Sequence, residues 1–218
     1  MRAARAAGAA AALTLAFAGG CSTPNGGTVV TTGLGDDPVR LESTFKGGYF
    51  SIEAAQTTVT LSSIPYEELA RGTAVNGAFL HIEVLWRPKA GATAVVPSAT
   101  NLSIRMVVVS NGEVGVYGGG GFGWIDDGTE DDTGIGIDIT GSALSLLDRT
   151  PGFVDLLSPA TVIGEVGAVK GVEEARAYIR AASQLVTNKL GRVRYVQWMA
   201  PGSALPLSAK WSLERGEG

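Results

Sequence analysis

The fold of this chain is decided by residues Leu102–Gly123, which read LSIRMVVVSNGEVGVYGGGGFG. Asn111-Gly112 separates two valine-rich runs. Asn-Gly is a strong signal for a two-residue type I′ hairpin turn, in which both turn residues take positive φ. The first run, Leu102–Ser110, has the nearly continuous apolar character of a central strand. The stretch therefore predicts two antiparallel strands at the centre of a sheet.

Strand patterns recur on both sides of this hairpin. β-branched and aromatic residues alternate with polar ones in short segments that end at glycine or proline. Ser142–Leu147 either extends the strand-like segment Ile135–Thr140 or follows it. Tyr66–Ala70, after Pro65, predicts one or two helical turns. The strand-like segments are Val39–Phe45, Tyr49–Glu53, Thr58–Ser62, Ala78–Arg87, Ile135–Thr140, Arg192–Met199 and Leu207–Leu213.

One long helix is predicted over Val172–Leu190. Apolar residues recur there at steps of three and four, acidic residues lie in the first turn, and Gly191 stands where a left-handed residue ends a helix. The fold class expected is therefore mainly β (α+β). It consists of an antiparallel sheet or a β-sandwich with this one amphipathic helix packed on it.

The composition limits the chemistry that the chain can perform. Of its 218 residues 45% are hydrophobic and 17% charged, which suits a single folded domain. One histidine and one cysteine exclude a zinc site built from several His or Cys ligands, and also an intrachain disulfide. The net charge of −4 argues against a nucleic-acid partner.

Residues 1–20 have the features of an export signal. Arg2 and Arg5 supply a positive start, an Ala/Leu-rich run follows, and small residues lead to Cys21, the only cysteine. An alternative is ordinary signal-peptidase cleavage after Ala16-Phe17-Ala18, which would release a secreted protein carrying a free thiol.

The segment Ala18-Gly19-Gly20-Cys21 resembles the lipobox of bacterial lipoproteins. This resemblance implies that Cys21 is lipidated and becomes the mature N-terminus, and that the protein is anchored in the cell envelope. Ser22 follows the cysteine, and in the resembling proteins an Asp at that place commonly signals retention in the inner membrane. The resemblance therefore implies the outer membrane. Residues 21–37 are expected to be the lipidated cysteine and a flexible tether spanning on the order of 20 Å, and residues 38–218 a single β-rich domain.

The glycine-rich run Gly118–Gly123 formally contains the G-x-G-x-x-G pattern of dinucleotide-binding loops. No helix pattern follows it, and the acidic residues that come next would repel phosphate, so nucleotide binding is not expected. We expect instead a glycine-rich bulge or hairpin with aromatic side chains packed over bare backbone. The candidate ligand-binding residues are Tyr117, Phe122 and Trp124.

Acidic residues follow this run at high density. Hard oxygen ligands suit Ca²⁺, the one cofactor considered, although the spacing is not that of an EF-hand loop and a solvated acidic loop is the alternative. The candidate calcium ligands are Asp126, Asp127, Glu130, Asp131 and Asp132.

His81 and Glu83 lie two apart on an alternating strand and share its outward face. Such a pair is able to polarise water in a hydrolase, but no nucleophile motif accompanies it, and a structural histidine is the competing interpretation.

A basic stretch around the predicted helix is a candidate surface for anionic lipid, glycan or an acidic partner, the alternative being an ordinary solvated helix face. Its residues are Arg176, Arg180, Arg192 and Arg194.

The function expected is that of a lipid-anchored cell-envelope protein whose β-rich domain binds or scaffolds another component without catalysis. The expectation rests on the anchor signal and on the lack of a catalytic motif in the sequence. A glycan- or small-ligand-binding module is the first alternative, and an extracytoplasmic hydrolase the second.

Overall fold

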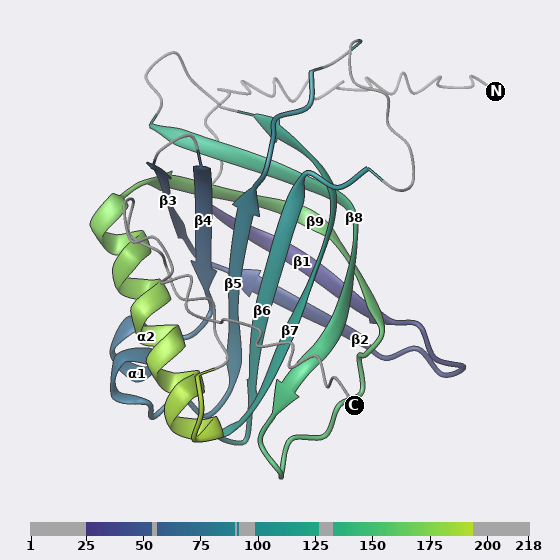
Figure 1. The fold of residues 1–218 in the computed structure, drawn as a ribbon, viewed down its shortest axis with the longest axis vertical. Helices are drawn as coiled ribbons and strands as arrows, with labels where there is room; N and C mark the ends of the chain where they lie inside the picture. Colours follow the sequence, from purple (N-terminus) through teal and green to yellow (C-terminus); the bar gives the residue numbers. More distant parts are fainter. Residues whose placement is uncertain (1–24, 54–55, 90, 92–98, 127–132, 194–218) are drawn as a thin grey trace, which may run out of the picture.

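The computed structural model of the chain describes residues 25–53, 56–89, 91, 99–126 and 133–193 (Figure 1). Over these residues the chain forms nine strands and two helices, which confirms the mainly β fold. The strands are β1 (Gly26–Gly33), β2 (Arg40–Phe45), β3 (Gly48–Glu53), β4 (Gln56–Ser62), β5 (Gly77–Val84), β6 (Leu102–Ser110), β7 (Glu113–Asp126), β8 (Gly134–Arg149) and β9 (Ala160–Lys170). The helices are α1 (Tyr66–Arg71) and α2 (Val172–Leu190).

The described strands belong to a single sheet, so the antiparallel sheet is confirmed and the two-sheet sandwich is not formed. Their order is β2-β1-β9-β3-β4-β5-β6-β7-β8. The long strand β9 also pairs along its length with β8, and Val169 and Lys170 near its end pair in parallel with Tyr49 and Phe50 of β3. These pairings close the sheet on itself, so that it has an inner face and an outer face (Figure 1).

The central hairpin forms as the sequence predicts. Asn111 and Gly112 have φ values of 52° and 77°, the positive values that a type I′ turn requires. β6 and β7 then pair in continuous register from Ser110 opposite Glu113 to Leu102 opposite Gly121.

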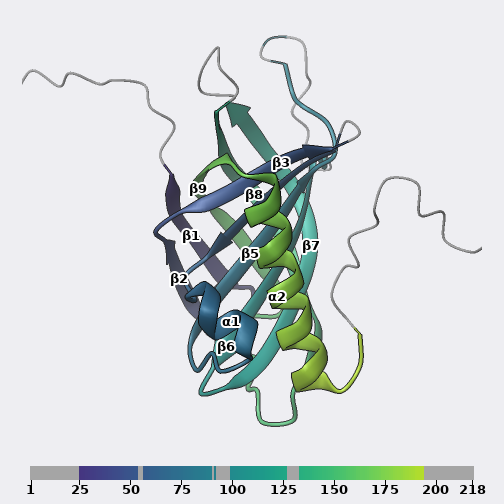
Figure 2. The same ribbon diagram turned by 90° about the vertical axis from the view of Figure 1, so that its left-hand side faces the viewer.

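Each face of the sheet has its own apolar cluster. Large side chains fill the inner face, among them Phe50, Leu61, Leu80, Ile82, Leu102, Ile104, Met106, Tyr117, Ile135 and Val162. Both helices pack on the outer face (Figure 2). The cluster beneath them includes Ile64, Leu69, Phe79, Val107, Val109, Val114, Val116, Ile179, Leu185 and Val186.

Helix α2 has the bounds predicted from the sequence. Gly191 takes φ 68° and donates its backbone N–H to the Thr187 carbonyl at 2.9 Å, which ends the helix as its position indicates. Ala175, Ile179 and Val186 of the predicted apolar stripe are buried. Among the described residues no helix is both long and apolar enough to cross a membrane.

The structure corrects the predicted tether. Residues 26–33, which the sequence analysis places between the anchor and the domain, form β1, a strand inside the sheet between β2 and β9. Val29 of this strand is fully buried. Threonine and valine, which make up the Thr-Val-Val-Thr-Thr run, favour strands. The pairing of this run with β2 and β9 holds the segment in the sheet although glycines flank it. Cys21 and residues 1–24 lie outside the described residues.

β9 is a strand that the sequence analysis did not identify. Ala160, Val162, Val166 and Ala168 are buried on its inner side, so an alternating signal is present in the sequence, although Gly164 and Gly167 interrupt it. Ser142–Leu147 extends the preceding strand, because β8 runs unbroken from Gly134 to Arg149. The two predicted C-terminal strands fall on residues of which only 192 and 193 are described, and these two are not in a strand.

Candidate functional site

The glycine run lies within a regular strand and not in a bulge. β7 passes through it without an extra residue, and the two register shifts fall on its partner β8. Because side chains on a strand alternate between its faces, Tyr117 points to the inner face, whereas Phe122 and Trp124 point to the outer face. The three predicted ligand-binding residues therefore do not form one site.

Tyr117 has a structural environment. Its ring packs edge-on against Phe153 with 6.3 Å between centroids, and its hydroxyl donates to Asp155 Oδ1 at 2.8 Å. Burial and this hydrogen bond raise the pKa of Tyr117. Asp155 Oδ1 also accepts the backbone N–H groups of Leu157 and Ser158, so Tyr117 anchors the loop between β8 and β9.

Phe122 and Trp124 belong to a row of three rings on the outer face, which we call the aromatic ladder (Trp86, Phe122 and Trp124). Phe122 and Trp124 meet edge to face with 5.2 Å between centroids, and Trp86 lies 6.2 Å from Phe122. Phe122 is buried, whereas Trp86 is 40% exposed. The ladder therefore offers an aromatic surface to solvent, in which β7 carries Phe122 and Trp124 and the segment after β5 carries Trp86.

Asn101 holds the ladder in place. Its side chain is fully buried, accepts the backbone N–H of Gly123 at 2.9 Å and donates to the Gly123 carbonyl at 2.8 Å. It also donates to the Trp86 carbonyl at 3.4 Å. The Trp86 indole N–H in turn donates to the Thr100 carbonyl at 2.9 Å. This network ties the segment after β5 to β7, between the positions of Trp86 and Trp124.

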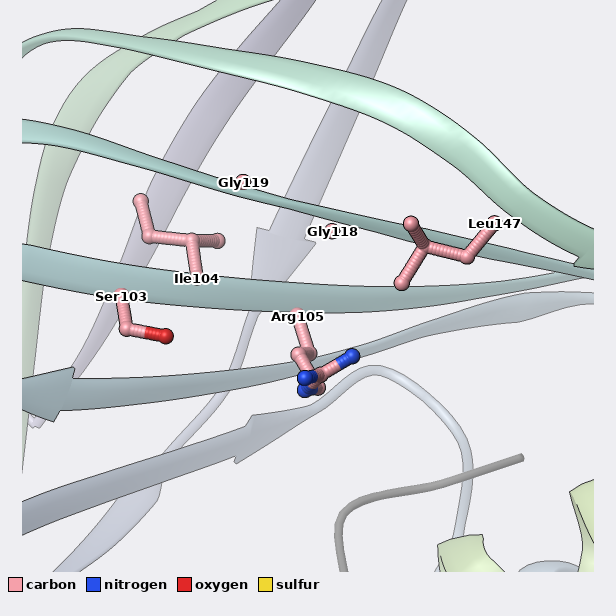
Figure 3. Close-up of a pocket in the computed structure, with 6 residues that line it drawn as sticks. All are labelled: Ser103, Ile104, Arg105, Gly118, Gly119 and Leu147. Atoms are coloured by element: carbon pink, nitrogen blue, oxygen red, sulfur yellow. The ribbon is translucent and has the colours of Figure 1, made fainter. Parts of the chain in front are cut away.

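Beside the ladder the outer face is hollowed over β7. The hollow has a volume of about 300 Å³, and we call it the glycine groove; it is lined by Ser103, Ile104, Arg105, Gly118, Gly119 and Leu147. Ser103 and Arg105 point to one side of β6 and Ile104 to the other (Figure 3). A Cβ atom on Gly118 would lie 2.5 Å from Leu147 Cδ1 and 3.5 Å from Arg105 Nη1. Leu147 therefore packs directly over the Gly118 backbone at the floor of the groove, and the Arg105 guanidinium lies beside it.

The row of residues between the groove and the ladder is polar. Glu83 of β5 stands opposite Ser103 of β6, which stands opposite Gly120 of β7. The outer face of β5–β7 therefore combines aromatic rings, a carboxylate, a hydroxyl and a guanidinium. Such a mixture is suited to binding polar ligands that have an apolar face.

His81 is in register with Arg105 on the neighbouring strand and is only 4% exposed. Burial, together with the nearby Arg105 charge, lowers its pKa to about 4. A general base works best with a pKa near the operating pH, so this imidazole is a weak base at neutrality. The geometry favours the structural interpretation of His81 over the hydrolase hypothesis.

The lowered pKa of His81 predicts acid sensitivity. The unfolded chain binds a proton there near the ordinary pKa of 6.5, but the folded chain does so only near 4, so stability falls as the pH drops through this window. Between about pH 7 and pH 5 we expect a loss of about 2 kcal/mol, measured by guanidinium unfolding. His81 is the only histidine, so His81→Gln removes this loss. An equal loss in the variant, or an imidazole that titrates near 6.5 in NMR spectra of the folded chain, would contradict the assignment.

The calcium prediction remains a prediction. Asp126 is the last residue of β7 and is exposed, whereas Asp127, Glu130, Asp131 and Asp132 lie outside the described residues. Within the described part of the chain no group of three or more His, Cys, Asp or Glu side chains is placed to hold a metal ion.

Two of the predicted basic residues, Arg176 and Arg192, pair with carboxylates. Arg176 contacts Glu53 at 2.9 Å and Glu173 at 2.7 Å. Arg192, beyond the other end of the helix, binds both carboxylate oxygens of Asp148. Arg180 is exposed on α2, and Arg194 lies outside the described residues.

Comparison of the chain with protein-family models, with curated proteins and with solved structures finds no match. The site therefore stands on geometry alone. Sequence reasoning did not select Arg105, Leu147 or Asn101, because only the pairing of β5 to β8 brings them to one surface.

Proposed function

We propose that this chain is a lipid-anchored cell-envelope protein whose β-rich domain binds another envelope component through the aromatic ladder, without catalysis. The observation that supports the proposal is the ladder itself. Trp86 is 40% exposed in the segment after β5, and the buried Asn101 side chain ties that segment to β7 by hydrogen bonds to Trp86 and Gly123. Exposed aromatic residues on a rigid support are the usual anchors of binding surfaces.

The neighbouring polar row supports a binding role. Glu83 and Ser103 lie beside the ladder on the same face of the sheet, so a partner seated on the rings also meets hydrogen-bonding groups. The one histidine of the chain is buried with a pKa of about 4, which makes it a poor catalytic base.

The anchor is inferred from the lipobox-like segment. The fold limits the distance between the anchored Cys21 and the domain. Gly26 already belongs to the sheet, so five residue steps separate it from Cys21. A fully extended chain of that length spans at most about 18 Å. A lipid on Cys21 would therefore hold the domain close to the membrane surface, where envelope components are its neighbours.

A glycan is the second candidate partner, favoured by the exposure of Trp86. An indole face beside a carboxylate and a hydroxyl suits a sugar ring, which stacks through its C–H groups and hydrogen-bonds through its hydroxyls. A protein partner is expected instead to cover the whole ladder together with its polar row.

The test is site-specific photocrosslinking in native envelopes. A photoreactive amino acid replaces Trp86 or Trp124, and the matched control position is Ile163, which is exposed on β9. We expect a dominant adduct from both ladder positions and none from position 163, with an acylated N-terminal peptide beginning at Cys21.

The adduct also separates the candidates. A protein adduct supports the scaffold and a carbohydrate adduct supports the glycan-binding module. Equal labelling from all three positions would contradict the assignment of the ladder. An unmodified Cys21 in protein released to the medium would contradict the anchor and leave the ladder to be judged on its own adducts.

A further inference from the structure

The end of helix α2 is fixed to strand β8 by an ion pair. After Gly191 ends the helix, Arg192 Nη2 lies 2.7 Å from Asp148 Oδ1, and Arg192 Nε lies 3.0 Å from Asp148 Oδ2. The Asp148 side chain is 7% exposed, so this two-point ion pair is held at a rigid strand. Arg192, next to the last described residue of this segment, is therefore tied to β8.

The glycine groove lies directly beside this ion pair. Asp148 stands opposite Val116 of β7, and Gly118, the floor of the groove, is two residues further along the same strand. At about 3.3 Å per residue this places the groove within about 7 Å of the Val116 position. A few residues beyond Val193 suffice to reach it.

The groove has the chemistry to hold an aromatic residue. Leu147 packs over the Gly118 backbone and is 47% exposed, so it gives the groove an apolar surface, and Arg105 is a cation at the edge. A guanidinium stacks well on an aromatic ring, and the exposed part of Leu147 is an apolar surface on which such a ring packs. Neither helix covers this part of β6 and β7 (Figure 1).

The segment that follows supplies such residues. Residues 195–199 read YVQWM, so four of five are aromatic or apolar. Burying these side chains against the groove is favourable because it removes apolar surface from water. Trp198 is five residues beyond Val193, and an extended chain of that length spans about 17 Å.

We propose that residues 195–199 of this chain's own C-terminal segment dock in the glycine groove, with an aromatic side chain packed on Leu147 and against Arg105. The docked segment would run from the Arg192–Asp148 pair across the outer face of β7 toward β6. It would leave the aromatic ladder, which lies further along β7, open to its partner. The proposal does not depend on the function proposed above.

The test is photocrosslinking from position 147 in the full chain, with a photoreactive residue in place of Leu147. Equal amounts of isotopically light and heavy protein are mixed, and crosslinked peptides are read by mass spectrometry. We expect crosslinks from position 147 into residues 195–199, with both peptides carrying the same label.

Variants sharpen the result. In the pair Tyr195→Ala and Trp198→Ala, the variant lacking the ring that docks is expected to lose crosslink yield about five- to tenfold, as is Arg105→Ala. Trp211→Ala is the matched control and keeps the yield. Crosslinks between light and heavy chains, crosslinks to another protein, or no crosslink into residues 195–199 would each overturn the proposal.

Discussion

Replacing Gly119 by Ala is expected to lower the free energy of unfolding by about 3–5 kcal/mol, the largest single-residue effect that we predict. A Cβ at this position would overlap the carbonyl oxygen of Ala143 and lie 2.9 Å from its carbonyl carbon. Both atoms belong to the backbone of β8, so no side chain is able to move aside. The strands β7 and β8 would have to separate within a continuous stretch of paired residues.

The matched control is Gly141→Ala. Gly141 lies close by on β8, but nothing stands within 4 Å of the position that its Cβ would take. Its expected effect is below about 1 kcal/mol. Denaturant unfolding followed by tryptophan fluorescence measures both variants. A Gly119→Ala protein as stable as Gly141→Ala would show that β8 does not lie against the glycine run as described.

Asn101→Ala is expected to cost about 3 kcal/mol. The substitution leaves the buried N–H and carbonyl groups of Gly123 without their side-chain partner, and an unpaired buried polar group costs about 1–3 kcal/mol. It also removes the contact to the Trp86 carbonyl, so the fluorescence of the ladder is expected to change in the folded protein.

Asn188→Ala is the control for this second substitution. Asn188 is exposed on α2 and accepts one hydrogen bond from Gln184, so its replacement is expected to change stability by less than about 0.5 kcal/mol. Equal stabilities of the two alanine variants would mean that Asn101 does not support β7.

The parts of the fold that could be predicted from the sequence are those governed by local signals. Asn111-Gly112 sets its own turn because only certain residues accept positive φ. The bounds of α2 follow from the apolar period and from Gly191, which acts within the last turn. These features need no knowledge of distant strands.

The parts that could not be predicted depend on distant pairing. The segment that forms β1 has the composition of a tether, and only its pairing with β2 and β9 makes it a strand of the sheet. The relative positions of the three predicted aromatic residues depend on this pairing as well. Phe122 and Trp124 lie together, but Tyr117 points to the opposite face because β7 keeps its alternation and β8 carries the irregularities. Trp86 and Arg105 come to lie on the same face as Phe122 and Trp124 only because β5, β6 and β7 are neighbours in the sheet.

The place of β1 in the sheet bears on when the protein can fold. Gly26, at the start of β1, the first strand of the described residues, pairs with Gly167 in β9, the last of them. Closing such a large loop is slow, and until β9 is available β1 and β8 each have one edge without its native partner. A chain crossing a membrane from its N-terminus would thus have to deliver about 170 residues before its sheet closed. If the chain is exported as proposed, its folding would complete only after export, and a chain cut before Ala160 is expected to aggregate.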